Sequence, residues 1–464
     1  MPVRRRGRAE LFEECTQSVP QEQRRPAARN THFRFVSGFR GRRQILRDAV
    51  RSQQGRDRHR RPDSRPDARM CSAPGPAPAA PSRHRRAPSA LMSRHSTADV
   101  AVVGLGAMGA LAAWRLAARG AGVIGFDPYR PGHDLGSSHG DTRIFRTAYF
   151  ESPDYVPLLQ RAQLLWRLLE KETDAELLTI TGGLAIGPRD GELVSGVVAS
   201  ARQNDLSHRL LDASEMSRTY PQHLLKKEEV AVLENEAGFL RPERAVSAAA
   251  ARAEALGARL MIGTQATSVE ASGSGVVVVT SRGRFEAEQA LITAGAWTPK
   301  LTRHLHLPLK VERQVMGWLA VTDPAVFAPL RFPVFIRETD HGRFRYGFPT
   351  TDGRSIKVAV HHEGSDADPD TIDREIHPAD VEPIRDFARD NLREVTGKVV
   401  DARVCMYTNT PDDRFIVAQD ASLPGVTILS ACSGHGFKFA PVMGELMAGS
   451  LLDGRAVPAI IHSA

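Results

Sequence analysis

A short apolar segment, Val100–Val103, is followed directly by a glycine-rich turn and then by a helical pattern. Three glycines of this turn have the spacing Gly-x-Gly-x-x-Gly: Gly104, Gly106 and Gly109. In such a turn the first glycine permits a tight bend, the second lets a pyrophosphate approach the backbone, and the third lets helix and strand pack closely. A second apolar strand ends at Asp127, whose carboxylate is placed to accept hydrogen bonds from a ribose diol. We therefore predict that this region binds an adenine dinucleotide, FAD or NAD, at the helix N-terminus; a glycine-rich turn without a ligand is the alternative.

The first 94 residues differ from the rest in charge and composition. They contain 23 Arg, no Lys and 8 acidic residues, so their net charge is +15, whereas the remainder carries −7 and the whole chain +8. Apolar periodicity is almost absent, and residues 72–81 are rich in Pro and Ala, which is typical of disordered segments. We expect residues 1–94 to form a disordered Arg-rich extension, and residues 1–91 to be an upstream translation artefact with Met92 as the natural start. A nucleic-acid-binding arm or a targeting peptide is the alternative.

Cysteine usage and the lack of long apolar runs bear on the compartment. The four cysteines are Cys15, Cys71, Cys405 and Cys432. Their spacing suggests neither a zinc site nor a disulfide framework, which favours a reducing compartment. The sequence contains no run of about 18 apolar residues that could span a membrane. We expect a cytoplasmic protein with no metal, no membrane contact and no nucleic-acid partner.

Helical and strand patterns alternate along the chain until about residue 308. Helices are expected at 155–171, 193–204 and 243–256, with Trp166 in the core, and a short strand at 179–187. Beyond residue 308 the pattern predicts a mostly antiparallel sheet. The predicted fold class is α/β combined with α+β: a Rossmann-like nucleotide-binding domain with an inserted, mostly antiparallel-sheet substrate domain. The expected boundaries are 95–178, 237–308 and 412–464 for the first domain, and 179–236 and 309–411 for the second.

A polar segment after the nucleotide motif contains His139, Arg143 and Arg146 at positions i, i+4 and i+7. This spacing would align the three side chains on one face of a helix, although the apolar residues between them also permit a strand. Two arginines near a nucleotide site suggest capture of a phosphate or a substrate carboxylate. A solvated basic face is the alternative.

Alternation along two predicted strands places chemically active side chains together. Lys357 and His361 share one face of the strand at 355–361, while Cys405 and Tyr407 share a face of the strand at 403–407. These four side chains could point to one ligand, or to solvent if the sheet has one wet face.

Near the C-terminus a strand leads into a glycine turn and a helix. His435 and Lys438 lie at this helix N-terminus, an arrangement that stabilises an anion, whether a carboxylate or a negatively charged reduced flavin.

From about Asp99 to Leu452 the sequence resembles the monomeric sarcosine oxidase and N-methyltryptophan oxidase family. The matching motifs are Gly104–Gly109, Ser138–Arg143 with Arg146, Tyr346–Pro349, Lys357 with His361, Cys405–Pro411 and Ser433–Lys438. The resemblance implies FAD rather than NAD, a D-amino-acid-oxidase-like fold and a substrate domain whose sheet covers the flavin.

The resemblance implies a role for each matching residue near the cofactor. Cys405 matches the cysteine that bonds covalently to the flavin through its sulfur. The other implied cofactor contacts are those of the first glycine motif with Met108, of His139, Thr142 and Arg143, and of the C-terminal turn: Gly434, His435 and Gly436.

On the substrate side, Arg146 and Lys438 match the pair that holds the substrate carboxylate. Lys357 matches the lysine that promotes the reaction of reduced flavin with oxygen. Tyr346, His361 and Tyr407 match groups that line the substrate cavity.

The implied reaction oxidises a secondary amino acid to an imine, passes a hydride to flavin N5, and reduces O2 to hydrogen peroxide. Sarcosine, a larger N-methyl amino acid or a cyclic imino acid such as pipecolate are possible substrates, and a monomer is expected. Cys432 departs from the bulky residue that the family carries there, which would enlarge the space near the flavin. The alternatives are a flavin dehydrogenase or primary-amine oxidase of the same fold, an RNA-associated flavoprotein that uses the basic arm, and a non-catalytic dinucleotide sensor.

Overall fold

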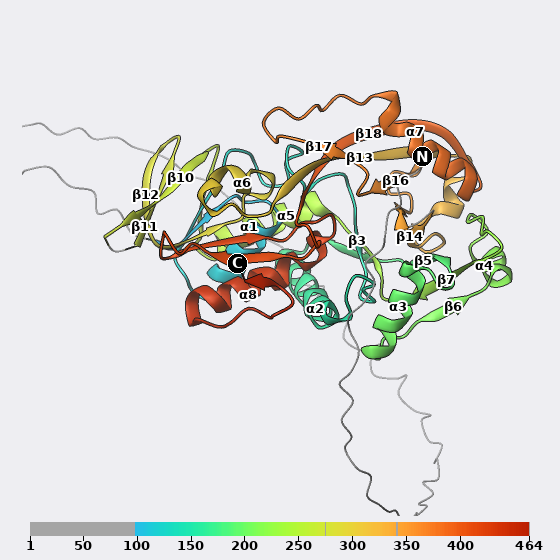
Figure 1. The fold of residues 1–464 in the computed structure, drawn as a ribbon, viewed down its shortest axis with the longest axis horizontal. Helices are drawn as coiled ribbons and strands as arrows, with labels where there is room; N and C mark the ends of the chain where they lie inside the picture. Colours follow the sequence, from blue (N-terminus) through green and yellow to red (C-terminus); the bar gives the residue numbers. More distant parts are fainter. Residues whose placement is uncertain (1–97, 274, 340–341, 464) are drawn as a thin grey trace, which may run out of the picture. The chain divides into compact units, whose positions relative to one another are not determined.

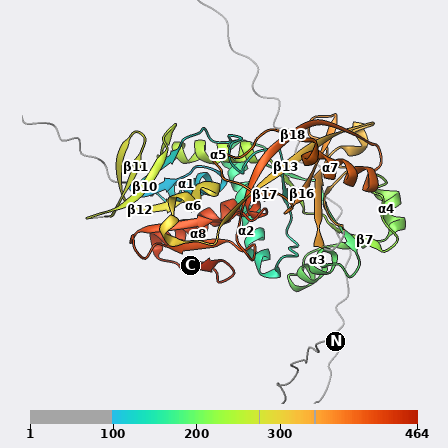
Figure 2. The same cartoon turned by 45° about the horizontal axis from the view of Figure 1, so that its top comes forward.

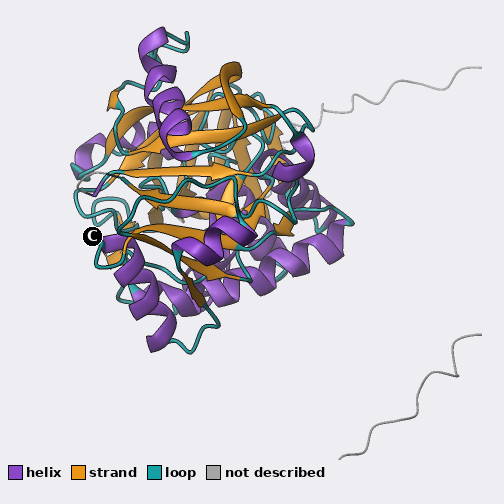
Figure 3. Cartoon of the chain, turned by 90° about the vertical axis from the view of Figure 1, so that its right-hand side faces the viewer, coloured by secondary structure: helices purple, strands orange, loops and turns teal. Residues whose placement is uncertain are grey.

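The computed structural model describes residues 98–273, 275–339 and 342–463, so the expectations for residues 1–94 lie outside the described residues. Viewed from the side, strands form the centre of this part of the chain and helices lie around them (Figure 3). Two nine-stranded sheets lie toward opposite ends of its long axis (Figure 1). A small third sheet is formed by short segments that lie, in the sequence, between strands of the two large sheets. The structure confirms the predicted fold class, a parallel nucleotide-binding sheet combined with a mostly antiparallel one.

The first sheet contains the strand that precedes the glycine turn. Its strand order is β21-β19-β20-β12-β1-β2-β9, and β10 and β11 extend β12 as an antiparallel meander. The central pairs of β1 with β2 and with β12 are parallel, as are β12 with β20 and β2 with β9. The strands are β1 (Ala98–Val103), β2 (Val123–Asp127), β9 (Arg259–Ile262), β10 (Ala266–Ser272), β11 (Gly275–Thr280), β12 (Gly283–Ile292), β19 (Ile416–Gln419), β20 (Val426–Ser430) and β21 (His462–Ser463).

Helices cover one face of this sheet, and their small residues allow close approach. They are α1 (Ala107–Ala117), α2 (Val156–Thr173), α5 (Pro242–Ala255) and α8 (Ala440–Asp453). The short α6 (Thr298–Leu301) after β12 packs its Leu301 on the other face. A Cβ on Gly444 of α8 would lie 2.7 Å from the carbonyl oxygen of Leu111 in α1, so the two helices pack with almost no space between their backbones. Helix α2 buries an apolar stripe at helical spacing that includes Trp166, as predicted.

The second sheet is antiparallel except for one pair. Its order is β17-β13-β16-β15-β14-β5-β7-β6, with β18 paired to β13, and β14 and β5 are parallel. Figure 2 shows α7 next to the long strands β13 and β18. The strands are β5 (Gly183–Pro188), β6 (Arg209–Leu211), β7 (Glu229–Glu234), β13 (Lys310–Val321), β14 (Val334–Glu338), β15 (Phe344–Phe348), β16 (Ser355–His361), β17 (Ser365–Asp366) and β18 (Val395–Asn409), and the helices are α3 (Glu192–Gln203), α4 (Ala213–Thr219) and α7 (Pro378–Asn391).

The third sheet shows the structure of two segments, residues 143–145 and residues 179–187. It consists of β3 (Arg143–Phe145), β8 (Gly238–Leu240) and β4 (Leu178–Ile180), in the order β3-β8-β4. Residues 143–145 therefore form a strand and not a helix, because they pair with β8. The single strand expected at 179–187 is wrong. Gly182, with a φ of +76°, turns the chain, and β4 and β5 belong to different sheets.

Candidate active site

A cavity of about 470 Å³ extends from the glycine turn after β1 to the second sheet. Most of the residues that the sequence singled out contribute to its wall. Those that line it are Gly104, Gly106, Met108, Asp127, Arg143, Arg146, Tyr346, His361, Cys405, Tyr407, Gly434, His435, Gly436 and Lys438. The parallel sheet thus provides one end of the cavity and the antiparallel sheet the other.

Four predicted site residues lie in the described structure but do not line this cavity: Gly109, His139, Thr142 and Lys357. Gly109 has a packing role, since a Cβ there would lie 1.8 Å from the carbonyl oxygen of Gly104. His139 is buried, and within the described residues neither of its ring nitrogens has a hydrogen-bond partner. Lys357 points at the 140–142 turn, where Nζ donates to the carbonyl oxygens of Gly140 at 2.8 Å and Thr142 at 2.6 Å.

The nucleotide end of the cavity has the geometry that the glycine spacing predicted. Gly104 has a φ of +92°, and a Cβ there would lie 2.7 Å from the Thr293 carbonyl oxygen. A Cβ on Gly106 would meet nothing nearer than 3.9 Å, so the backbone at Gly106 is open to the cavity. The first residues of α1, Ala107 and Met108, also line the cavity, which places the positive end of the helix there. These features fit the pyrophosphate of a dinucleotide.

Asp127 closes this end of the cavity at the end of β2. One carboxylate oxygen accepts a hydrogen bond from the backbone N–H of Leu105 at 2.7 Å, and the other from that of Tyr129 at 2.8 Å. Burial raises the pKa of Asp127 although both backbone donors act against the shift. The carboxylate is therefore fixed by the turn itself, and its remaining acceptor capacity is directed at the cavity, where a ribose hydroxyl would lie.

At the other end, two buried cations line the cavity. Arg146 forms an ion pair with Glu151, donating from Nη2 to a carboxylate oxygen at 2.6 Å, and its guanidinium lies 4.2 Å from the ring centre of Tyr149. Lys438 donates from Nζ to the carbonyl oxygen of His435 at 2.7 Å. Burial and the nearby charge of Arg146 lower the pKa of Lys438 to about 7. This region therefore attracts an anion, and Glu151 competes for Arg146 with any anion that enters.

Supporting contacts hold both cations in place. The buried carboxylate of Glu234 accepts hydrogen bonds from the backbone N–H groups of Thr147 at 2.6 Å and Ala148 at 3.2 Å, which fixes the segment that follows Arg146. Trp166 donates from its indole nitrogen to the carbonyl oxygen of Lys438 at 3.0 Å. Trp166 is thus a core residue, as predicted, that also anchors the turn carrying Lys438.

Tyrosines and histidines form another part of the cavity wall, and three of them, Tyr346, His361 and Tyr407, lie on the second sheet. The hydroxyl of Tyr407 lies 3.3 Å from Nδ1 of His361 and 3.4 Å from the hydroxyl of Tyr346. His435 is held between the Tyr149 hydroxyl at Nδ1 and the carbonyl oxygen of Asp413, 2.8 Å from Nε2. Burial lowers the pKa of His435 to about 4, so the imidazole is neutral at neutral pH. Because Nε2 of this neutral ring donates to the carbonyl oxygen, Nδ1 accepts from the tyrosine hydroxyl.

Cys405 lies at the junction of the two ends. Its sulfur is buried and faces Arg143, whose Nη2 is 3.5 Å away. The same guanidinium donates to the carbonyl oxygens of Ser137 and Thr142, each at 2.9 Å, so its position is fixed. Cys432 lines the cavity as well, and burial raises the pKa of its thiol. Of the two cavity cysteines, Cys405 is the one with a cation next to its sulfur.

Several residues of the site were not predicted from the sequence. Glu151 was not singled out, although an acidic residue five positions after Arg146 was visible in the sequence. Trp297, Lys300 and Asp370 line the outer part of the cavity, where Trp297 donates to Asp370 at 2.7 Å. No sequence pattern connects these three residues, because they come together only through the fold.

Comparison with known proteins identifies the class to which this fold and site belong. The family model of the FAD-dependent oxidoreductases (DAO) matches residues 99–450. Monomeric sarcosine oxidase of Streptomyces avermitilis is 41% identical over 362 residues, covering 77% of this chain and 94% of the relative. N-methyl-L-tryptophan oxidase of Salmonella enteritidis is 33% identical over 362 residues, covering 75% and 93%.

Two solved structures show the same fold at lower identity. NikD, described as an unusual amino acid oxidase essential for nikkomycin biosynthesis, superimposes with a TM-score of 0.69 at 22% identity, over 78% of this chain and 95% of NikD. L-proline dehydrogenase of P. horikoshii gives a TM-score of 0.67 at 20% identity, over 78% and 94%. The chain belongs to the FAD-dependent oxidoreductases and, among them, to the monomeric sarcosine oxidase and N-methyltryptophan oxidase family. Across the described residues, no helix is long and apolar enough to cross a membrane.

Proposed function

We propose that this protein is an oxidase of secondary amino acids, with sarcosine or another N-methyl amino acid as substrate, O2 as electron acceptor and hydrogen peroxide as product. The observation that carries this proposal is that two buried cations, Arg146 and Lys438, line the same cavity as Cys405. Paired cations in a water-poor pocket suit a carboxylate. The nucleotide end of the cavity fits the dinucleotide part of FAD, which supplies the two-electron redox chemistry when bound.

Different residues of the chain bind the substrate, orient its amine and attach the cofactor. Arg146 and Lys438 bind the substrate carboxylate, so that the amine is directed toward the wall formed by Tyr346, His361 and Tyr407. Covalent attachment of FAD through the Cys405 sulfur is part of the proposal and is supported by the guanidinium of Arg143 3.5 Å from that sulfur. The carboxylate of the substrate has to take the place of Glu151 on Arg146.

Peroxide formation and oxygen uptake test the proposed function directly. We expect both with sarcosine, N-methyl-L-tryptophan or L-pipecolate, and neither with dimethylamine, which lacks the carboxylate. Reduction of an artificial dye without peroxide formation would instead indicate a dehydrogenase. An equal rate with dimethylamine would overturn the assignment of Arg146 and Lys438.

Replacing Arg146 by glutamine is expected to raise the KM for sarcosine by about 10–150-fold, because a hydrogen bond to a charged group contributes about 1.5–3 kcal/mol. Glu151→Gln should lower KM, because it frees Arg146 from its ion pair. Steady-state kinetics measure both effects.

Arg161→Gln provides a matched control for these variants, since Arg161 is a half-exposed arginine that pairs with Glu445 away from the cavity. It should leave KM unchanged. The double variant Arg146→Gln/Glu151→Gln should bind substrate better than Arg146→Gln alone, because Glu151 no longer repels the carboxylate. A KM that does not respond to Arg146→Gln would contradict the proposed carboxylate site.

A further inference from the structure

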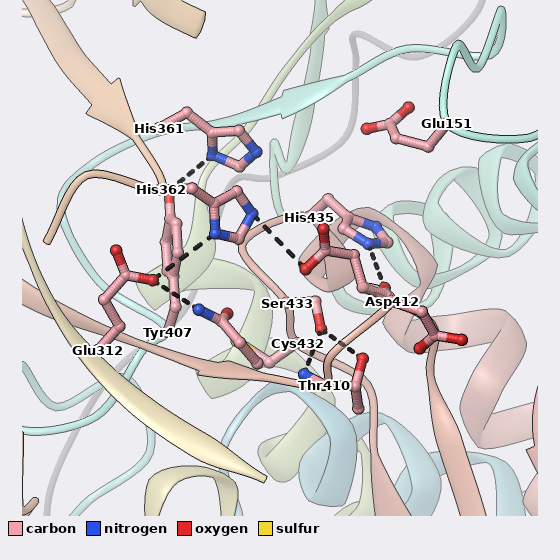
Figure 4. A network of polar contacts seen from close by, with 12 residues as sticks. Glu151, Glu312, His361, His362, Tyr407, Thr410, Asp412, Cys432, Ser433 and His435 are labelled. Atoms are coloured by element: carbon pink, nitrogen blue, oxygen red, sulfur yellow. Dashed lines mark hydrogen bonds and ion pairs between the residues drawn. The ribbon is translucent and has the colours of Figure 1, made fainter. Parts of the chain in front are cut away.

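Behind the wall of tyrosines and imidazoles lies a second group of polar side chains that the proposed reaction does not use (Figure 4). Its centre is His362, which follows the cavity-lining His361 directly in the sequence and does not line the cavity. Glu312 of β13 and Asp413 of the loop after β18 flank it.

The backbone brings the His362 ring back onto His361. Successive residues of a strand normally point to opposite faces, but His362 has a φ of +57° at the end of β16. As a result the two imidazole rings lie with their centres 4.1 Å apart. Asp413 and Ser433, which face the same ring from neighbouring loops, also have positive φ values of 57° and 40°. The left-handed backbone conformation is energetically costly for residues other than glycine, and such residues collect at functional sites.

Two carboxylates surround the His362 imidazole. Nδ1 lies 3.6 Å from Oε2 of Glu312, and Nε2 lies 4.0 Å from Oδ1 of Asp413. Glu312 itself is fixed by three donors at 2.6 Å: the side-chain amides of Gln314 and Asn409 and the backbone N–H of Gly364. An imidazole between two acidic groups is held as the cation. Burial acts against the charge, yet Glu312 and Asp413 raise the pKa of His362 above its usual value.

His361 has the opposite electrostatic environment. Burial, and next the adjacent His362, hold the pKa of His361 well below its usual value, and His435, Lys438 and Arg146 act in the same direction. Two tyrosines also face the pair: the hydroxyl of Tyr407 lies 3.3 Å from Nδ1 of His361, and the ring centre of Tyr346 lies 6.2 Å from that of His361. His361 therefore stays a neutral imidazole, and the His362 ring meets it edge to face.

We propose that His362 is a positioning residue for the proposed oxidation: as an imidazolium between Glu312 and Asp413 it adds to burial in keeping His361 uncharged, so that the cavity wall presents a hydrogen-bond acceptor to the substrate amine. A charged His361 would have no lone pair for the amine N–H and would repel a protonated amine. This inference rests on the proposed function for the identity of the ligand, while the coupling between the two imidazoles does not depend on it.

The test removes the charge of His362 and follows the protonation of His361. His362→Asn is neutral and Asn tolerates a left-handed backbone, whereas His362→Arg keeps a planar cation at the same position. In the full-chain holoenzyme labelled with 13C at histidine Cε1, the His361 signal is assigned by its loss in His361→Gln. We expect the His361 titration to move upward by about one pH unit in His362→Asn and to remain as in the wild type in His362→Arg.

Kinetics provide the second measurement. The acidic limb of the pH profile of kcat/KM for sarcosine should move upward in His362→Asn by the same amount and should return in His362→Arg. An unmoved His361 titration in His362→Asn, or an equal shift in both variants, would overturn the inference, because the second result indicates packing and not charge. If the His361 titration moves but the wild type oxidises no amino acid, the proposed function fails and the coupling of the two imidazoles stands.

Discussion

Replacing Lys357 by methionine is expected to slow the reaction of the reduced holoenzyme with O2 by about 10²–10³-fold, which is the usual effect of removing one preorganised charge or donor from a reacting centre. The Lys357 ammonium is buried, and two of its three N–H groups are held by the carbonyl oxygens of Gly140 and Thr142. In the proposed oxidase, a fixed positive charge at this position would stabilise the negative charge that develops on oxygen. Reduction by the amino acid should change far less, because no oxygen charge develops in that step.

The protonation of Lys357 adds a pH dependence to this prediction. Burial, and next the charge of Arg143, lower the pKa of Lys357 well below its usual value. Because only the ammonium form carries the charge, the rate constant for reoxidation should fall as pH rises through this lowered pKa. In Lys357→Met the same rate constant should not change over that pH range. Stopped-flow measurements of the two half-reactions separate these effects.

Unfolding is not expected to explain the result. Methionine is unbranched and of similar length, and the Lys357 ammonium lies 4.1 Å from the ring centre of Phe348, which a methionine side chain can also contact. A buried ammonium without a carboxylate partner has to lose its hydration, so its removal should leave Tm unchanged or raise it. Equal slowing of both half-reactions, or a clear drop in Tm, would contradict the role of Lys357 in the oxygen reaction.

Local rules of the backbone explain how much of the fold could be predicted. The turn at Gly104 depends on a positive φ and on close contacts within a few residues, so its glycine spacing predicted the nucleotide end of the cavity. The helix α2 was predicted from its buried stripe for the same reason. Residues 143–145 remained ambiguous because their strand exists only through pairing with β8, about 95 residues further along the chain. Helix α7, which contains Pro383, was not expected within the strand-rich region.

The candidate site shows the same division between local and distant interactions. Alternation in β16 correctly separated Lys357 and His361 from the apolar face that packs in the core, but it did not show that Nζ of Lys357 would reach the 140–142 turn. His362 breaks the alternation through its positive φ, which no spacing rule predicts. The ion pair of Arg146 with Glu151 depends on the path of the intervening loop. Irregular backbone in loops and contacts between distant segments are therefore the parts of the site that a single sequence leaves open.

Removal of the Cys405 sulfur should abolish covalent attachment of FAD completely. In Cys405→Ala the reacting atom is absent, so after acid precipitation the yellow colour should move from the protein pellet to the supernatant. Gly106 and Asp127, which are proposed to hold the dinucleotide, are unchanged in this variant. We therefore expect it to bind FAD without a covalent bond, as measured by absorbance before and after precipitation.

The second cysteine of the cavity provides the matched control. Cys432 also lines the cavity and is half-buried, but its sulfur accepts a hydrogen bond from the backbone N–H of Thr408 at 3.4 Å and burial raises its pKa. The thiolate is the nucleophilic form of cysteine, so a raised pKa makes Cys432 the weaker nucleophile at neutral pH. Cys432→Ala should keep its flavin in the pellet. Retention of covalent flavin by Cys405→Ala, together with its loss in Cys432→Ala, would move the attachment point to Cys432 and would refute the proposed role of the Arg143 guanidinium beside Cys405.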